Sequence, residues 1–198
     1  MAANNSRRLF DNISPVYHFL YARQRKHYQR YYKEKIDCNL SRFSSVLDVG
    51  CGSGAMASIF SDLGLRTFGV DQSLGMLRVA KRQPENHKLT LIQNGAVDGL
   101  PFRDKSFDVI IAAYMAHGIK TEMRLKLYSE MKRVGRHLAI LHDYSDERSL
   151  ITTVVEYAEG GDYFNFIKVI KNELEQNFGN LEVVPLEKRA TCYICSLE

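Results

Sequence analysis

The apolar positions of the chain follow two spacings that alternate along the sequence. Short apolar runs predict buried strands at residues 46–49, 66–70, 89–93, 107–113 and 137–141. Between them, apolar residues recur at helical spacing, as in a helix from Thr121 with Leu125, Tyr128 and Met131 on its inner face. Strands alternating with helices indicate an α/β protein, in which a parallel sheet carries helices on both faces.

The two ends of the chain depart from this alternation. Residues 181–186 and 191–197 are two predicted strands joined by only a few residues. Because a parallel crossover needs about a dozen residues, this pair must be antiparallel. Before it, we expect a long helix capped by Asp162 and an earlier short helix ending at Val155. At the other end, a helix is predicted from about Pro15, after Ser14.

The composition is typical of one soluble globular domain, with 198 residues of which 45% are hydrophobic and 25% charged. No apolar run is long enough for a transmembrane helix, and we expect neither a secretory signal nor membrane insertion. Cys192 and Cys195 lie three apart on a predicted strand, so their side chains point to opposite faces. We therefore expect reduced thiols, no metal site and a cytoplasmic location.

The positive charge gathers at the start of the chain. Residues 1–35 carry a net charge of +6, whereas the whole chain carries only +4. That total is too mild to mark a nucleic-acid binder by itself. We favour an amphipathic helix that lies on the domain with its cations in solvent, over an arm that binds nucleic acid or a membrane.

A glycine-rich loop follows the first predicted strand and precedes a helix. Gly50, Gly52 and Gly54 allow a sharp turn, and the helix N-terminus favours a negative group. Asp71 ends the next strand, 21 residues after Gly50, where a carboxylate accepts hydrogen bonds from a ribose diol. No Gly-Lys-Ser/Thr follows, which excludes a P-loop. The loop also fits a dinucleotide motif, although Asp48 and Gly54 argue against NAD.

Residues 46–54 (VLDVGCGSG) resemble motif I of the class I S-adenosylmethionine (SAM)-dependent methyltransferases. Residues 95–102 and 106–110 resemble a stretch of the methyltransferase-11 group, as in ubiquinone and menaquinone methyltransferases. The resemblance implies a Rossmann-like, doubly wound, seven-stranded sheet of order 3-2-1-4-5-7-6 with its last strand antiparallel. It also implies SAM as cofactor, S-adenosylhomocysteine (SAH) as product, and two parts: a helical cap over the cofactor site (1–40) and the SAM-binding domain (41–198).

The same resemblance assigns cofactor contacts. It places Asp48 at the ammonium group, the loop along the methionine and ribose, and Asp71 at the ribose hydroxyls. The full set that it implies is Asp48, Gly50, Cys51, Gly52, Gly54, Asp71, Gln72, Ser73, Met76, Ala96, Val97 and Ala113. Ala96 stands where Asp is usual, so we expect weaker or altered adenine recognition.

Residues after the fourth and fifth strands are the candidates for chemistry. His117 or His142 is a candidate general base, because imidazole titrates near neutrality, and Tyr114 and Tyr144 are candidate acceptor contacts. Asp143 fits either a cap or a catalytic group. Residues 10–18 resemble the opening segment of the quinone methyltransferases, which closes over SAM. Tyr17 is therefore a candidate catalytic or cofactor contact, or a core residue.

These observations predict a SAM-dependent methyltransferase that moves a methyl group to a small-molecule acceptor by in-line displacement. Three alternatives stay open: an RNA-directed methyltransferase that uses the basic N-terminal segment, a non-catalytic SAM-binding module, and an NAD(P) oxidoreductase. No Asn/Asp-Pro-Pro-Tyr/Phe motif follows the fourth strand, which disfavours methylation of a base amino group. Because the insertion after the fifth strand is short, we expect the N-terminal helix, or a second subunit in a homodimer, to supply much of the wall of the acceptor pocket.

Overall fold

The computed structural model describes residues 2–34, 40–145, 162–187 and 190–198. Its strands are β1 (Ser45–Val49), β2 (Arg66–Asp71), β3 (Thr90–Gln93), β4 (Phe107–Ala113), β5 (Gly135–Tyr144), β6 (Leu181–Glu187) and β7 (Ala190–Ser196). Its helices are α1 (Ala2–Glu34), α2 (Ala55–Asp62), α3 (Leu74–Lys81), α4 (Thr121–Val134) and α6 (Tyr163–Phe178), with 3-10 turns η1 (Leu40–Arg42), η2 (Pro84–Asn86) and η3 (Ala116–Gly118). The expected short helix ending at Val155 lies outside the described residues.

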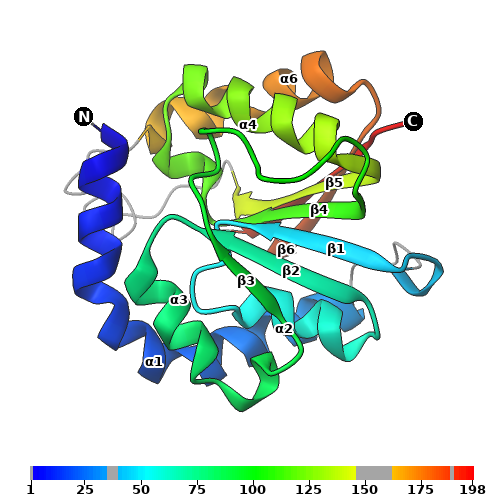
Figure 1. The fold of residues 1–198 in the computed structure, drawn as a ribbon. Helices are drawn as coiled ribbons and strands as arrows, with labels where there is room; N and C mark the ends of the chain where they lie inside the picture. The colour runs from blue at the N-terminus through cyan, green and yellow to red at the C-terminus, as the bar shows by residue number, and fades with distance from the viewer. Residues whose placement is uncertain (1, 35–39, 146–161, 188–189) are drawn as a thin grey trace. The chain divides into compact units, whose positions relative to one another are not determined.

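The strands form one sheet of order β3-β2-β1-β4-β5-β7-β6, which confirms the predicted fold (Figure 1). Strand β1 runs parallel to β2, β2 to β3, and β4 to β5. Strand β7 lies antiparallel between β5 and β6. The short link between β6 and β7 leaves no room for a crossover, so the chain turns back beside itself.

The chain divides into two compact units, residues 1–101 and 102–198. In the first, α2 packs against β1 and β2, and α1 packs against α2 and α3. In the second, α4 packs against β4 and β5, and α6 packs against α4, β6 and β7. Every residue of β1 is buried, as are six of the seven in β4 and six of the seven in β7, as expected for strands covered on both faces.

Helix α1 begins at Ala2, so the prediction of a helix start near Pro15 was wrong. Proline has no N–H to donate to the carbonyl four residues before it, which here belongs to Asp11. The hydroxyl of Ser14 donates to that carbonyl instead, at 2.9 Å. The lost main-chain hydrogen bond is thereby replaced, and the helix continues through the proline.

The inner face of α1 is fixed to the first unit by polar contacts. The hydroxyl of Tyr21 donates to Oδ1 of Asn86 at 2.9 Å. Arg25 donates to the hydroxyl of Ser58 at 3.0 Å and pairs with Asp62. The tyrosines expected at helical spacing line the buried side; those buried are Tyr21, Tyr28, Tyr31 and Tyr32. The helix thus lies on the unit, as the amphipathic interpretation predicted.

Two expectations for the second unit need correction. Leu125 is 42% exposed, and Arg124 takes the buried place on α4 because Glu173 of α6 binds it with both carboxylate oxygens at 2.8 Å. Asp162 precedes α6 at the N-cap position, but its side chain makes no cap hydrogen bond to that helix. It accepts from Arg124 at 2.8 Å instead, since a buried guanidinium needs anionic partners.

Candidate cofactor and acceptor sites

The glycine loop adopts the sharp turn that its sequence predicts. Gly50, Gly52 and Gly54 all have positive φ angles, of 76°, 52° and 77°. A Cβ on Gly54 would lie 2.5 Å from Nδ2 of Asn86, closer than real Cβ contacts allow. The main-chain N–H groups of Gly50 and Cys51 donate to the carbonyl of Val70, at 2.8 and 3.0 Å, which holds the loop against the end of β2.

Asp71 at the end of β2 is tied to this loop. One carboxylate oxygen accepts from the N–H of Gly52 and the other from the N–H of Ser73, both at 2.8 Å. Burial raises the pKa of Asp71, and these two main-chain donors oppose that shift. The carboxylate therefore stands at the loop's edge in a fixed orientation.

Asp48 lies inside β1, two residues before the loop, and is only 1% exposed. No well-formed hydrogen bond from the described residues reaches either of its carboxylate oxygens, although the main-chain N–H of Ala57 acts to lower its pKa. Burial, followed by the negative charge of Asp71, raises the pKa of Asp48 to about 7. A buried carboxylate without a cation is costly, so a cationic group placed beside it would be stabilised.

The other predicted cofactor residues of the first unit lie on α3, just after β2 and on the turn after β3. Met76 is buried in α3, with its terminal methyl 3.1 Å from where a Cβ of Gly52 would stand. Ser73 is the N-cap of α3 and accepts from the N–H of Met76 at 3.0 Å, as predicted. Gln72 is half-buried, as are Ala96 and Val97 on a turn after β3. The N–H of Asn94 donates to the carbonyl of Asp71 at 3.0 Å, joining this turn to the end of β2.

Asp11, for which no role was predicted, binds to the start of α3 beside these residues. Its Oδ1 accepts from the hydroxyl of Ser73 at 2.7 Å and from the N–H of Gly75 at 2.8 Å. These bonds, that from Gly75 first, lower the pKa of Asp11. A Cβ on Gly75 would meet the Ser14 hydroxyl at 2.7 Å, so glycine permits the close approach of α1. The one available signal was that Asp11 belongs to the segment 10–18 that resembles the quinone methyltransferases.

Tyr17 is half-buried on α1, with its ring 6.5 Å from that of Phe10 in an edge-on arrangement. The nearby His18 contacts the side-chain amide of Gln83 at 3.2 Å. Both contacts lie within the first unit. The assignment of Tyr17 to the cofactor or substrate stays a prediction.

In the second unit, His117 and Asp143 form a hydrogen-bonded pair. Nδ1 of His117 lies 2.7 Å from Oδ1 of Asp143, and both side chains are buried. The other oxygen, Oδ2, accepts from the N–H groups of Ala116 and His117, at 3.0 and 3.3 Å. Asp143 therefore binds the start of η3 and the histidine on it, so it serves as a cap and as a partner of His117.

His142 and Asp143 were expected after the fifth strand, but β5 continues to Tyr144. It is longer than predicted because β7 pairs with it on the other side, with His142 opposite Cys192. The side chain of His142 is fully buried, and its ring lies 5.1 Å from that of Tyr114. The carboxylate of Asp143 holds the other candidate histidine, His117.

Aromatic rings gather around this pair. The ring of Tyr144 lies 4.7 Å from that of His117, 5.2 Å from that of Tyr114 and 5.3 Å from that of Tyr163. Tyr114 follows Ala113, the half-buried last residue of β4, and has a left-handed backbone with φ of 48°. Such a conformation is unusual for a bulky residue and occurs often at functional sites.

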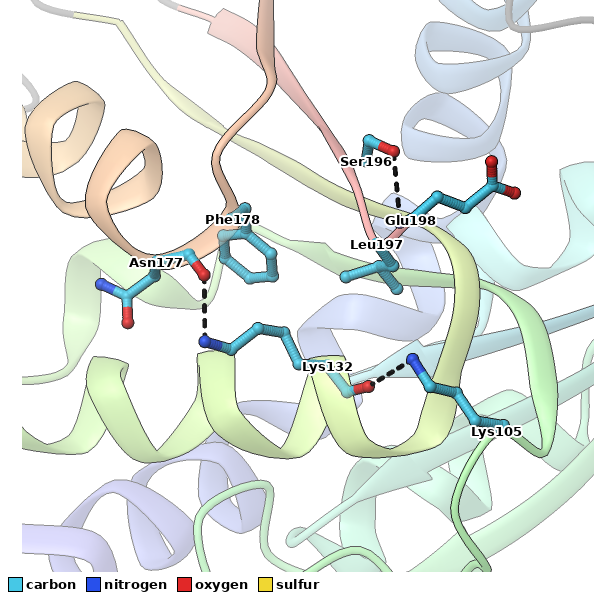
Figure 2. A pocket seen from close by; sticks show the side chains of 7 residues that line it. All are labelled: Lys105, Lys132, Asn177, Phe178, Ser196, Leu197 and Glu198. Carbon is cyan, nitrogen blue, oxygen red and sulfur yellow. Dashed lines mark hydrogen bonds between the residues drawn. The ribbon is translucent and has the colours of Figure 1, made fainter.

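A pocket of about 200 Å³ lies elsewhere in the second unit, where β4 and β5 begin (Figure 2). In it, Nζ of Lys132 donates to the carbonyl of Asn177 at 2.9 Å, and Nζ of Lys105 donates to that of Lys132 at 3.2 Å. These ammonium groups satisfy carbonyls at the ends of α6 and α4, where cations are favoured. The pocket thus has a structural explanation and lies at the opposite ends of these strands from Tyr114 and Asp143.

Three further observations concern metals, thiols and membranes. Within the described ranges, no three His, Cys, Asp or Glu side chains gather as metal ligands would. Cys51, Cys192 and Cys195 are buried free thiols. Of the helices that the structure describes, none is long and apolar enough to cross a membrane.

Comparison with known proteins identifies the class that the sheet order and glycine loop define. Residues 47–141 match the methyltransferase-11 family model, described as "Methyltransferase domain". The predicted resemblance is therefore confirmed for residues 47–141, which match the methyltransferase domain of the SAM-dependent methyltransferase-11 group.

The curated relatives carry different functions in their names. The chain is 35% identical over 118 residues to the uncharacterized methyltransferase YcgJ of Bacillus subtilis, covering 57% of this chain and 46% of that protein. It is 30% identical over 133 residues to a demethylmenaquinone methyltransferase of Paenarthrobacter aurescens (65% and 49%). It is 31% identical over 140 residues to an 18S rRNA (guanine-N(7))-methyltransferase of Schizosaccharomyces pombe (64% and 51%). The chain spans about half the length of these relatives.

Solved structures support the fold. Magnesium protoporphyrin IX methyltransferase from Synechocystis PCC 6803, crystallised with bound SAH, superposes with a TM-score of 0.60 at 18% identity. The match covers 81% of this chain and 76% of that one. At this identity, the likeness supports the fold and leaves the acceptor open.

Proposed function

We propose that this chain transfers the methyl group of SAM to a small-molecule acceptor. The observation that carries the proposal is the Asp71 carboxylate bound to the glycine loop, with the buried Asp48 two residues before that loop. When bound, SAM supplies a methyl carbon already activated by its sulfonium. The protein's task is then to bind the cofactor, orient the acceptor and exclude water.

The residues of the first unit fit this cofactor. Asp48 is a buried carboxylate with no well-formed hydrogen bond from the described residues, and the SAM ammonium would supply the missing cation. Each oxygen of Asp71 makes one main-chain bond and keeps a lone pair that a ribose hydroxyl would use. The positive φ at Gly52 places main chain without a side chain beside these groups. Gln72, Met76, Ala96 and Val97 would flank the adenine, and Ala113 is the remaining predicted cofactor contact.

The proposal is tested by calorimetric titration of the chain with SAM, SAH and NAD. We expect SAM and SAH to bind and NAD to show no heat of binding. Tighter binding of NAD would support the oxidoreductase alternative. Binding of SAM without turnover on a broad acceptor panel would favour a non-catalytic module.

An RNA acceptor is the second candidate, because one face of α1 is basic. Arg8, Arg23, Lys26 and Arg30 are all exposed on this helix, and the one acidic residue between residues 7 and 32, Asp11, is bound to Ser73 and Gly75. RNA binding through this face would weaken steeply as salt rises, in proportion to the number of phosphates contacted. Fluorescence anisotropy with a labelled RNA at 50 and 200 mM salt tests this; affinity that does not change with salt would reject the RNA candidate.

The proposal extends to the remaining expectations. In it, α1 covers the bound cofactor with Tyr17, so residues 1–40 act as a cap on the SAM-binding domain at 41–198. It includes a homodimer, which would supply further walls for the acceptor, and a cytoplasmic location, which the free thiols of Cys51, Cys192 and Cys195 support. Sedimentation velocity tests the dimer, and a monomer at micromolar concentration would reject it.

A further inference from the structure

The 3-10 turn η3 is fixed at both of its ends by buried side chains. At its start, Asp143 accepts from the N–H groups of Ala116 and His117. Just beyond its end, Arg124 donates to the carbonyl of Ile119 at 2.6 Å. Arg124 is itself held by both oxygens of Glu173 at 2.8 Å. The backbone that carries His117 is thus held more firmly than an ordinary connecting loop.

The bond between His117 and Asp143 also selects a tautomer. A carboxylate accepts hydrogen bonds, so Nδ1 of His117 carries the proton and donates it to Oδ1 of Asp143 at 2.7 Å. In a neutral imidazole, Nε2 is then the nitrogen with the lone pair. Oδ1 also accepts from the N–H of Tyr144 at 2.8 Å, which fixes the carboxylate itself.

The surroundings suit a flat acceptor. Tyr114 and Tyr144 are half-buried, whereas Tyr163 is buried beside Tyr144. Aromatic rings prefer edge-on and offset contacts with other rings. The backbone of Tyr114, at the same edge of the unit, has the left-handed conformation that is strained for a bulky residue.

From this geometry we propose that His117 is the general base for an aromatic hydroxyl acceptor and that Asp143 is its positioning residue. The inference rests on the proposed methyl transfer and names its acceptor class. The acceptor oxygen forms a bond to the methyl carbon while the carbon–sulfur bond of SAM breaks, and its electron pair stays on sulfur as the neutral thioether. The hydroxyl proton passes to Nε2 of His117. An amine acceptor would attack with its own lone pair and need no such base at the moment of transfer.

The first test reads the tautomer without any turnover. Long-range 15N–1H correlation spectra of the chain labelled in its histidine rings report which nitrogen is protonated, at a pH where the ring is neutral. The signal of His117 is assigned by its loss in His117→Asn. We expect protonation at Nδ1; protonation at Nε2 would overturn the proposal. Each oxygen of Asp143 accepts from two N–H groups. In Asp143→Asn, one of these oxygens becomes an NH2 group that cannot accept, so we expect a mixture of the two His117 tautomers.

The second test separates the base from its hydrogen bond. The amide N–H of His117→Asn can still donate to Asp143, but no nitrogen remains to take a proton. With SAM and catechol as probes, we expect turnover to fall by about 10²- to 10⁴-fold and SAM affinity to be unchanged. His137→Asn, at an exposed ion pair with Glu198, is the matched control and should turn over as wild type.

The outcomes separate this inference from the proposed function. A wild-type chain that fails to bind SAM refutes the proposed methyl transfer. The tautomer of His117 is measured without SAM, so the spectra still test the hydrogen bond to Asp143 in that case. A chain that binds SAM yet methylates aniline as fast as catechol, or methylates neither, overturns the acceptor class alone. Full turnover of catechol by His117→Asn would leave His117 with a structural role only and overturn its assignment as base.

Discussion

The carboxylate of Asp71 accepts a hydrogen bond from the main-chain N–H of Gly52 at 2.8 Å. The bond joins the end of β2 to the middle of the glycine loop. Because Asp71 is held by main-chain donors, its orientation does not depend on a ligand. A ligand that meets a group already in place loses less free energy to ordering. The loop and the acid therefore form one unit, which explains why their spacing in the sequence is informative.

Replacing Asp48 with asparagine should stabilise the protein at neutral and alkaline pH. The pKa of Asp48 is raised to about 7 in the folded chain, well above that of an unfolded aspartate. The folded state therefore holds the proton longer, and ionisation of Asp48 reduces stability as the pH rises from about 4 to 7, by at most about 1.4 kcal/mol per pH unit. Thermal unfolding of Asp48→Asn and wild type across pH 4–8 measures this.

The advantage of Asp48→Asn should grow between pH 4 and 7 and then stay constant, while SAM affinity falls because the ammonium loses its partner. Asp62→Asn, at an exposed site of the same unit, is the control for charge removal. A variant that is less stable than wild type at pH 8 would show that Asp48 has a stabilising partner.

Two glycines with similar backbones allow steric crowding to be separated from backbone strain. Gly54 and Gly64 have φ angles of 77° and 88°. A Cβ at 54 would collide with Asn86, whereas a Cβ at 64 meets nothing within 4 Å. Gly64→Ala should cost about 1 kcal/mol from the left-handed backbone alone, and Gly54→Ala about 1–3 kcal/mol more. Denaturant unfolding measures both; equal losses would show that Asn86 moves aside without cost.

Asp11→Ala should weaken the attachment of α1 to α3. The carboxylate accepts from the Ser73 hydroxyl and the Gly75 N–H, so its loss resembles removal of a helix cap, worth about 1 kcal/mol. The pKa of Asp11 is lowered on folding, so its contribution is present above the pKa of an unfolded aspartate and is lost as the pH falls through the lower folded value. Urea unfolding at pH 7 and pH 3 tests this, with Asn12→Ala on the exposed face as control.

An undiminished effect of Asp11→Ala at pH 3 would mean that the side chain acts through packing and not through its charge. A loss at pH 7 that shrinks in acid would establish the cap.

Much of the fold could be predicted because local patterns set it. The apolar runs located the five parallel strands, and the short link after β6 required the antiparallel pair. The failures occurred where a distant partner decided the outcome. Arg124 displaced Leu125 from the inner face of α4 because Glu173, 49 residues away, binds it. The start of α1 was missed because Ser14 compensates for Pro15 through a side-chain bond that no spacing rule contains.

In the candidate site, too, the residues set by local sequence could be predicted and those set by a distant partner could not. Asp48 and the glycine loop belong to one contiguous motif, and Asp71 follows at a characteristic spacing, so all of them could be predicted from the sequence. The hydrogen bond between His117 and Asp143 joins residues 26 positions apart. A single sequence does not show which residue of a turn lies against the end of a distant strand. Asp143 was seen as either a cap or a catalytic group, and the structure shows that it caps η3 and binds His117 at once.

The buried ion pair of Arg124 and Glu173 should be the most sensitive point of the second unit. Among the residues that the structure describes, Arg124→Met leaves the buried Glu173 carboxylate with the hydroxyl of Tyr128 at 3.2 Å as its remaining donor, so we expect a loss of about 3–5 kcal/mol. The double variant Arg124→Met/Glu173→Leu should recover much of that loss, because no unpaired charge remains. Glu198→Gln, at an exposed pair, should change stability by less than about 0.5 kcal/mol. A double variant no more stable than Arg124→Met would contradict this view.

The most direct measurement is calorimetric titration of SAM into wild type and Asp71→Ala, with thermal unfolding to verify that both are folded. Loss of the charge-assisted hydrogen bonds to the ribose should weaken binding by about 2–3 kcal/mol. Unchanged SAM affinity in a folded Asp71→Ala chain would contradict the placement of the ribose, and with it the proposed cofactor site.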